Sequence, residues 1–109
     1  MTTLSTHVLD VERGAPARGV PVELYRGDQS LVRAETNADG RVADLADGSL
    51  EPGTTYRLTF DVAAYLAAQG RANPFLQRVS IDFEVRAADP HCHLPMLLSA
   101  HACTVYRGS

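Results

Sequence analysis

Short stretches in which apolar and polar residues alternate recur along the chain. The clearest lie at residues 20–25, 55–60 and 79–85, where every second residue is valine, leucine, isoleucine or an aromatic. Successive side chains of a β-strand point to opposite faces, so each stretch predicts a strand with one face in a core. Less regular strands are expected at residues 7–11, 31–36, 93–99 and 103–107, with a brief extension at 41–45.

Residues that favour turns separate these stretches. The tetrapeptide Asn37-Ala38-Asp39-Gly40 predicts a tight turn, because Asn, Asp and Gly tolerate the positive φ that such a turn requires. Other turns or loops are expected at Arg13-Gly14, Gly27-Asp28, Asp47-Gly48, Glu51-Pro52-Gly53 and residues 87–90.

One segment lacks the alternation and predicts a helix. Residues 62–69 are rich in alanine, Asp61 before them is a suitable N-cap, and Gly70 after them suits the left-handed residue that ends many helices. We expect a helix of about two turns here, followed by a loop at residues 71–75.

The predicted elements define the fold class. Seven or eight short strands and one helix in a chain of 109 residues are typical of an all-β sandwich of two sheets. A chain of this length forms one domain, so residues 1–109 are treated as a single unit. The alternation does not determine the order of the strands within the sheets.

Composition and charge exclude several classes of protein. The net charge is −3 and the ten basic residues are all arginines scattered along the chain, whereas nucleic-acid binding requires a clustered basic face. No apolar run approaches the ~20 residues that cross a membrane. The first residues lack the pattern of a secretory signal, so we interpret the two cysteines as reduced thiols and expect a cytoplasmic protein.

Reactive or anion-binding side chains occur at four places. His7 is either a surface histidine or a general base, because imidazole exchanges protons near neutral pH. Arg41 follows the predicted turn, where it either faces solvent or uses its planar guanidinium to clamp an anion or a developing oxyanion. The other two places are the His91-Cys92-His93 cluster and the segment Tyr106-Arg107-Gly108-Ser109.

The last two places also allow more than one interpretation. His91 and His93 are two residues apart, so on a strand they share one face. Zinc usually requires about four ligands, and only Cys103 or His101 could join them through folding, so a single catalytic histidine is favoured over a metal site. Ser109 is either part of a frayed end or of a site, and no Gly-x-Ser-x-Gly signature marks it as an acylated serine.

Five segments follow one another along the chain as a set: Leu4-Ser5-Thr6-His7-Val8-Leu9-Asp10, Gly19-Val20-Pro21-Val22, Thr36-Asn37-Ala38-Asp39-Gly40-Arg41, His93-Leu94-Pro95-Met96-Leu97-Leu98-Ser99 and Tyr106-Arg107-Gly108-Ser109. In order and spacing this set resembles the 5-hydroxyisourate hydrolase family, the enzymatic relatives of transthyretin. The resemblance covers nearly the whole chain. The last segment is the family's carboxy-terminal tetrapeptide, which transthyretins proper lack.

This resemblance implies a fold, a function and a site. The family has a transthyretin-like sandwich and hydrolyses the small molecule 5-hydroxyisourate to 2-oxo-4-hydroxy-4-carboxy-5-ureidoimidazoline in urate degradation, without a cofactor or metal. It forms homotetramers, as dimers of dimers, with sites in the channel between two dimers. The residues that correspond to its site are His7, Arg41, His93 and Ser109 as catalytic residues, and Arg41, Tyr106, Arg107 and Ser109 as substrate-binding residues.

Two other functions are kept as alternatives. A transthyretin-like carrier would bind a hydrophobic small molecule without turnover, and a metal-binding or structural sandwich would use the two neighbouring histidines and Cys103. The chain departs from the family's pattern at Cys92, at residues 73–77 and at residues 100–105, and these changes affect the shape of the pocket.

Overall fold

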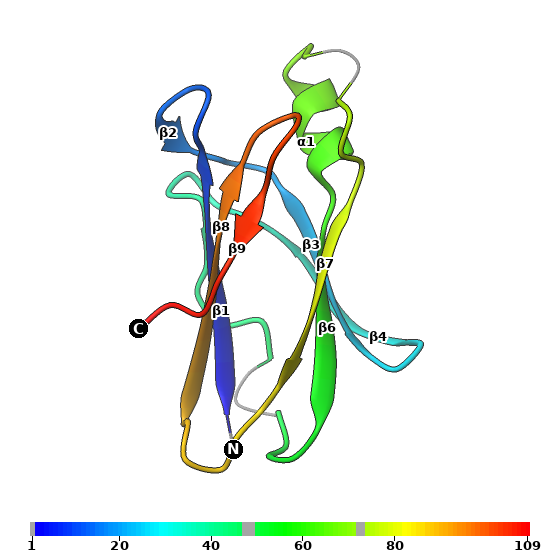
Figure 1. Cartoon of the computed structure of the whole chain (residues 1–109), viewed down its shortest axis with the longest axis vertical. Coiled ribbons are helices and arrows are strands. Elements are labelled where there is room, and N and C mark those ends of the chain that lie inside the picture. The colour runs from blue at the N-terminus through cyan, green and yellow to red at the C-terminus, as the bar shows by residue number, and fades with distance from the viewer. Residues whose placement is uncertain (1, 47–49, 72–73) are drawn as a thin grey trace.

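The computed structural model of the protein describes residues 2–46, 50–71 and 74–109, which form two β-sheets (Figure 1). The first sheet contains β1 (Thr3–Asp10), β2 (Ala15–Pro16), β5 (Arg41–Val42), β8 (His91–Leu98) and β9 (Thr104–Val105). The second contains β3 (Pro21–Arg26), β4 (Gln29–Glu35), β6 (Thr55–Phe60) and β7 (Val79–Glu84). This arrangement confirms the predicted all-β sandwich.

The strand order places β1 and β8 in the middle of the first sheet. That sheet has the order β2-β1-β8-β9, with β5 also paired to β1, and the second has the order β4-β3-β6-β7. β1 and β8 run parallel, whereas the other strand pairs in the described residues are antiparallel. The parallel register sets Ser5 opposite His93 and His7 opposite Pro95.

The hydrophobic core lies between the two sheets. Leu4, Thr6 and Val8 of β1 are fully buried, and the same alternation buries Val22 and Leu24 of β3. Burying one large aliphatic side chain contributes roughly 1.5–3 kcal/mol, so a register shift that turned these faces outward would be strongly disfavoured. β6 and β8 supply further core residues, namely Tyr56, Leu58, Phe60, Leu94, Met96 and Leu98.

The predicted strand bounds are accurate where the alternation is regular and inaccurate elsewhere. β6 has the predicted bounds, and β3 and β7 agree with prediction to within one residue at each end. β1, however, begins at Thr3 rather than at residue 7, and β8 begins at His91 rather than at residue 93. Threonine, serine and histidine at the starts of these strands obscure the hydropathy pattern, although backbone pairing extends through them.

Three strands of two residues each were poorly predicted. β5 and β9 are shorter than the stretches expected at 41–45 and 103–107, and β2 was not predicted at all. They bring the number of strands in the described residues to nine, compared with the seven or eight expected. A strand of two residues is too short to show an alternation, so only its pairing with β1 or β8 reveals it.

The predicted helix is observed as α1 (Val62–Ala68). The side chain of Asp61 accepts a hydrogen bond from the backbone N–H of Ala64 at 3.0 Å, which confirms the expected N-cap. Gly70 has a φ of 70°, as expected for the residue that ends the helix.

In the parts of the chain that the structure describes, no helix has the length and apolar character needed to cross a membrane. The turn predicted at Asp47-Gly48, and residues 72 and 73 of the predicted loop, lie outside the described residues.

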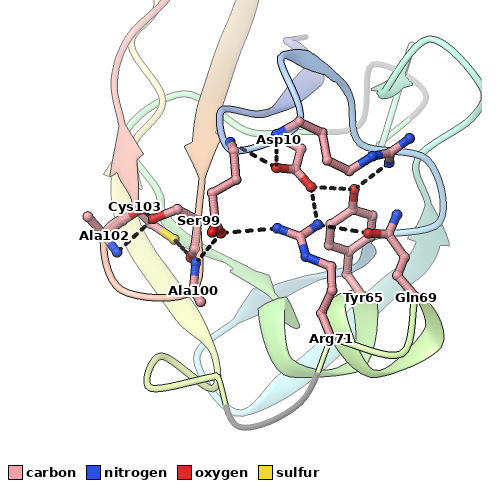
Figure 2. Close-up of polar contacts among 10 residues, drawn as sticks. Asp10, Tyr65, Gln69, Arg71, Ser99, Ala100, Ala102 and Cys103 are labelled. Carbon is pink, nitrogen blue, oxygen red and sulfur yellow. Dashed lines mark hydrogen bonds and ion pairs between the residues drawn. The ribbon is translucent and has the colours of Figure 1, made fainter.

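A buried carboxylate at the end of β1 connects three segments of the chain (Figure 2). The side chain of Asp10 accepts a hydrogen bond from the hydroxyl of Tyr65 in α1 at 2.8 Å and forms an ion pair with Arg71 at 2.5 Å. Arg71 also pairs with Glu12 at 3.0 Å, and Glu12 accepts a hydrogen bond from the backbone N–H of Ala100 at 3.0 Å. These contacts, which we call the Asp10 network, link the end of β1, the helix and the loop after β8.

Candidate active site

The outer face of the first sheet carries three of the predicted site residues. His7 on β1 and His93 on β8 alternate with buried residues, so they point away from the core, and both are half-buried. Arg41 on β5 is directly opposite His7 in the antiparallel register and is exposed. The fold therefore places two imidazoles and a guanidinium on one face, although they come from distant parts of the chain.

The turn before Arg41 is held against β1. The side-chain oxygen of Asn37 accepts hydrogen bonds from the backbone N–H groups of Asp39 at 2.9 Å and of Arg41 at 3.0 Å. Gly40 has a φ of 74°, and a Cβ at this residue would clash with the carbonyl oxygen of Val8. Only glycine lets the turn approach β1 this closely, so the predicted turn also fixes the position of Arg41 beside His7.

Hydroxyl groups of β1 bind the two histidines of β8. Oγ of Ser5 lies 2.8 Å from Nδ1 of His93 and 2.8 Å from Nε2 of His91. The hydroxyl of Thr3 contacts Nδ1 of His91, and the two imidazole rings stack with their centroids 6.5 Å apart. The prediction that His91 and His93 share one face is confirmed. Ser5 and Thr3 were missed because the strand was predicted to begin after them, although their alternation with His7 was a usable signal.

The surroundings of His93 favour its neutral form. Partial burial lowers the pKa of His93 most, and the nearby Arg41, His91 and His7 lower it further. A neutral imidazole can accept a proton, so His93 has the protonation state that a general base needs at pH 7. Because Ser5 engages Nδ1, Nε2 is the ring nitrogen that remains to bind water or a ligand.

The C-terminal tail continues the pairing of β9 along β8. The backbone N–H of Tyr106 donates to the carbonyl of Pro95 at 3.3 Å, and that of Gly108 donates to the carbonyl of His93 at 2.8 Å. A Cβ on Gly108 would lie 2.5 Å from Cδ2 of His93, so a larger residue would displace the ring or the tail. Ser109 directly follows the residue that contacts His93, and it is exposed.

Tyr106 and Arg107 lie on different sides of this tail. By the alternation of paired strands, Tyr106 lies with Pro95 on the outer face, whereas Arg107 turns toward the edge of the sandwich. There its Nη2 lies 2.9 Å from Oδ1 of Asp89, beside a cleft of about 170 Å³ that His93 also lines. The ion pair joins the tail to the segment that precedes β8.

The cluster of histidines does not extend to a metal site in the described residues. Among them, no group of three or more His, Cys, Asp or Glu side chains could hold a metal ion. Cys103 lies beyond the far end of β8, where its Sγ contacts the carbonyl oxygen of Ser99 at 3.6 Å, and His101 stacks on Phe75. The two further ligands considered for zinc are therefore not beside His91 and His93.

A larger depression lies on the outer face of the second sheet. Its volume is about 490 Å³, and Glu23, Arg33 and Arg78 are among its lining residues. Nε of Arg33 lies 2.8 Å from Oε2 of Glu23, and hydrogen bonds from Ser30 and Arg33 lower the pKa of Glu23 to about 2. A carboxylate held ionised by a fixed partner does not exchange protons near pH 7, so the first sheet is the better candidate for catalysis.

Comparison with known proteins identifies the family of the chain. The profile of the HIUase/Transthyretin family matches residues 4–108. The 5-hydroxyisourate hydrolase 2 of Rhizobium meliloti is 42% identical over an alignment of 114 positions, which covers 97% of this chain and 95% of that protein. The structure of Klebsiella pneumoniae 5-hydroxyisourate hydrolase superposes with a TM-score of 0.89 at 41% identity, over 99% of this chain and 100% of the other.

A transthyretin proper is similar in fold but more distant in sequence. Sea bream transthyretin, in a structure with thyroxine, superposes with a TM-score of 0.87 at 26% identity, over 96% of this chain and 93% of the other. The match to the family profile over nearly the full length, together with relatives above 40% identity, is decisive. The chain belongs to the HIUase/Transthyretin family.

Proposed function

We propose that the protein is a 5-hydroxyisourate hydrolase that opens the substrate ring to give 2-oxo-4-hydroxy-4-carboxy-5-ureidoimidazoline. The observation that carries this proposal is the outer face on which His7, His93 and Arg41 meet beside the C-terminal tail. The relatives support it, since the Rhizobium and Klebsiella proteins at 42% and 41% identity are both named as hydrolases of 5-hydroxyisourate.

In the proposed mechanism, water attacks a ring carbonyl of the substrate and the adjacent C–N bond breaks. His93, whose pKa is lowered by burial and by Arg41, takes a proton from the water as its oxygen bonds to carbon. His7 orients the water or the substrate. General base catalysis of this kind contributes about 10²–10⁴-fold to the rate, and the leaving ring nitrogen departs with a proton.

Arg41 binds the acyl-urea edge of the substrate and stabilises the negative charge that develops on the attacked carbonyl. Within the described ranges Arg41 forms no ion pair, so its donors are available to a ligand. One well-placed donor contributes about 10²–10³-fold. Ser109 positions a histidine or the substrate, while Tyr106 and Arg107 shape the pocket, the latter through its ion pair with Asp89. The reaction is a hydrolysis of an electrophilic ring and requires no cofactor.

We further propose that a homotetramer, a dimer of dimers, completes the site. The exposed fractions of Leu97, Val11 and Tyr106 are 36%, 48% and 49%, and Leu97 and Tyr106 lie on the face that carries the histidines. A second copy would bury these apolar groups and enclose a site that is open in one chain. Light scattering should give about four times the chain mass of 11.8 kDa. A fully active monomer would contradict this assembly.

The activity is tested by generating 5-hydroxyisourate from urate with urate oxidase and following its decay with and without the protein. We expect a clear acceleration that falls about 10²–10³-fold in Arg41→Ala. Arg57→Ala is the matched control, because this exposed arginine pairs with Asp82 at 3.1 Å on the second sheet. Decay at the spontaneous rate with a folded tetramer would overturn the proposal, and tight binding of an aromatic ligand without turnover would then establish the carrier function.

A further inference from the structure

Four side chains on the outer face form a continuous chain of hydrogen bonds. It runs from Thr3 to His91, from His91 to Ser5 and from Ser5 to His93. The parallel register makes this possible, because Thr3 is directly opposite His91 and Ser5 is directly opposite His93. Within this series of hydrogen bonds, Oγ of Ser5 joins the two imidazoles and lies 2.8 Å from a nitrogen of each ring.

The Ser5 hydroxyl couples the protonation of the two rings. It has one proton, so it donates to one imidazole nitrogen and must accept from the other. When it donates to Nε2 of His91, it accepts from Nδ1–H of His93, and Nε2 of His93 is a free base. When it donates to Nδ1 of His93, that ring carries its proton on Nε2 and becomes a donor instead.

We propose that Ser5 and His91 form a proton relay, which connects His93 to solvent and switches Nε2 of His93 between base and acid. The proposal rests on the proposed hydrolase function and adds two positioning residues to it. His93 is half-buried, with Gly108 packed against its ring, whereas His91 is exposed. His91 is therefore the end of the relay that exchanges protons with water.

The transfers balance at each step. Nε2 of His93 takes a proton from the attacking water, and Nδ1 of His93 passes its own proton to Oγ of Ser5. The Ser5 hydroxyl passes its former proton to Nε2 of His91, which releases a proton from Nδ1 to Thr3 and solvent. His93 is then neutral with a proton on Nε2. When that proton goes to the leaving ring nitrogen, the same transfers run in reverse and restore the starting state.

The charges around His93 favour the passage of its proton to His91. Burial and the positive Arg41 lower the pKa of His93, and His7 lies on the same face. His91 is exposed, so a proton that reaches its ring can pass to water. The cleft that adjoins His93 contributes charges of both signs, from Glu84, Arg86, Asp89 and Arg107.

Substitution of Ser5 tests the relay kinetically. Ser5→Ala breaks the connection but leaves Nε2 of His93 in place, so we expect kcat to fall about 10-fold, less than the roughly 10²–10⁴-fold contribution of the base itself. KM should change little, and added imidazole buffer should restore part of kcat by exchanging the proton directly. Ser5→Thr keeps the hydroxyl and should keep the wild-type pH profile, and Ser80→Ala is the matched control on the second sheet.

The tautomers of the two histidines give a readout that does not depend on activity. In ¹⁵N spectra, His91→Gln should change the Nδ1 signal of His93 in the wild-type background but not in Ser5→Ala. Three results would overturn the relay. The first is an unchanged kcat and pH profile in Ser5→Ala, and the second is a loss of kcat that neither added imidazole nor Ser5→Thr restores. The third is a His93 Nδ1 signal that does not respond to His91→Gln. An inactive wild-type protein whose rings are coupled would contradict the hydrolase function instead.

Discussion

β1 carries a polar network on each of its faces, and the two networks differ in chemistry. On the outer face, Ser5 joins the imidazoles of His91 and His93, and all three side chains are at least partly accessible. On the core side, Asp10 is fully buried and is held by Arg71 and Tyr65 (Figure 2). The strand therefore has hydroxyl and imidazole partners, which can both donate and accept hydrogen bonds, on one side and an ion pair on the other.

The difference shows how one strand serves both chemistry and stability. A carboxylate can only accept hydrogen bonds and a guanidinium can only donate them, so the direction of each bond in the Asp10 network is fixed. Removing one partner of a buried ion pair leaves an uncompensated charge. Hydroxyl and imidazole groups donate or accept, so the network of Ser5 can change direction at little cost. The first kind of network holds segments together, and the second can move protons.

His93→Ala should show the largest difference between an effect on activity and an effect on stability. Loss of the general base should lower kcat/KM by about 10²–10⁴-fold, while the free energy of unfolding changes little because the ring lies on a half-exposed face. The decay assay and urea denaturation measure the two quantities. A loss of activity accompanied by an equal loss of stability would show that His93 acts through the fold.

The converse effect is expected from Asp10→Ala. This change removes the buried acceptor of Arg71 and of the Tyr65 hydroxyl. Because Arg71 keeps its ion pair with Glu12, the free energy of unfolding should fall by about 3 kcal/mol, the lower end of the range for a broken buried pair. The matched control is Asp82→Ala, because Asp82 pairs with Arg57 at 3.1 Å on the exposed surface, where the loss should be about 0–1 kcal/mol. Equal losses in the two variants would contradict the distinction between buried and exposed pairs.

A smaller effect on activity is expected from Gly108→Ala. The added Cβ would lie 2.5 Å from Cδ2 of His93 and 2.9 Å from Cγ of Pro95, so the ring or the tail must move. A displacement of this kind near the reacting groups costs up to roughly 10²-fold in rate, whereas the core is untouched. Wild-type kcat together with an unshifted His93 signal in NMR spectra would show that the tail moves aside without affecting the site.

The smallest effects concern pH, where the two networks should respond in different ranges. Burial alone would raise the pKa of Asp10, but hydrogen bonds from Arg71, Tyr65 and the Arg13 backbone outweigh it and lower the pKa. Since the folded value is depressed, this stabilisation is complete above the unfolded value of about 3.9 and is lost as pH falls below it. Asp10→Asn should therefore flatten the stability curve in acid.

The activity should instead respond to the titration of His93. Its pKa is lowered, chiefly by burial, so the neutral base persists below the ordinary value of about 6.5 and the acidic limb of kcat/KM should lie below that pH. Because the pKa of His93 is lower in the folded protein than in the unfolded chain, the free energy of unfolding should decrease as pH falls from about 6.5 toward the folded pKa. An acidic limb at or above pH 6.5 would contradict the assignment of His93 as the base.

Much of the sandwich could be predicted because hydropathy and backbone pairing agree in its regular strands. β6 was predicted with correct bounds, since Tyr56, Leu58 and Phe60 are all in the core. The start of β1 could not be predicted in this way, because Thr3 and Ser5 are polar residues whose partners are on β8, far along the chain. The same error left Ser5 out of the predicted site residues.

The sequence by itself determined the alternation that builds the core, the turn that requires Gly40, the helix cap at Asp61 and the identity of the family. These depend on neighbours within a few residues or on motifs in a set order. Only the tertiary structure decided that β1 and β8 pair in parallel, that Ser5 lies between two histidines and that Arg107 turns to Asp89. Such contacts depend on register between segments distant in the chain, and no local pattern encodes that register.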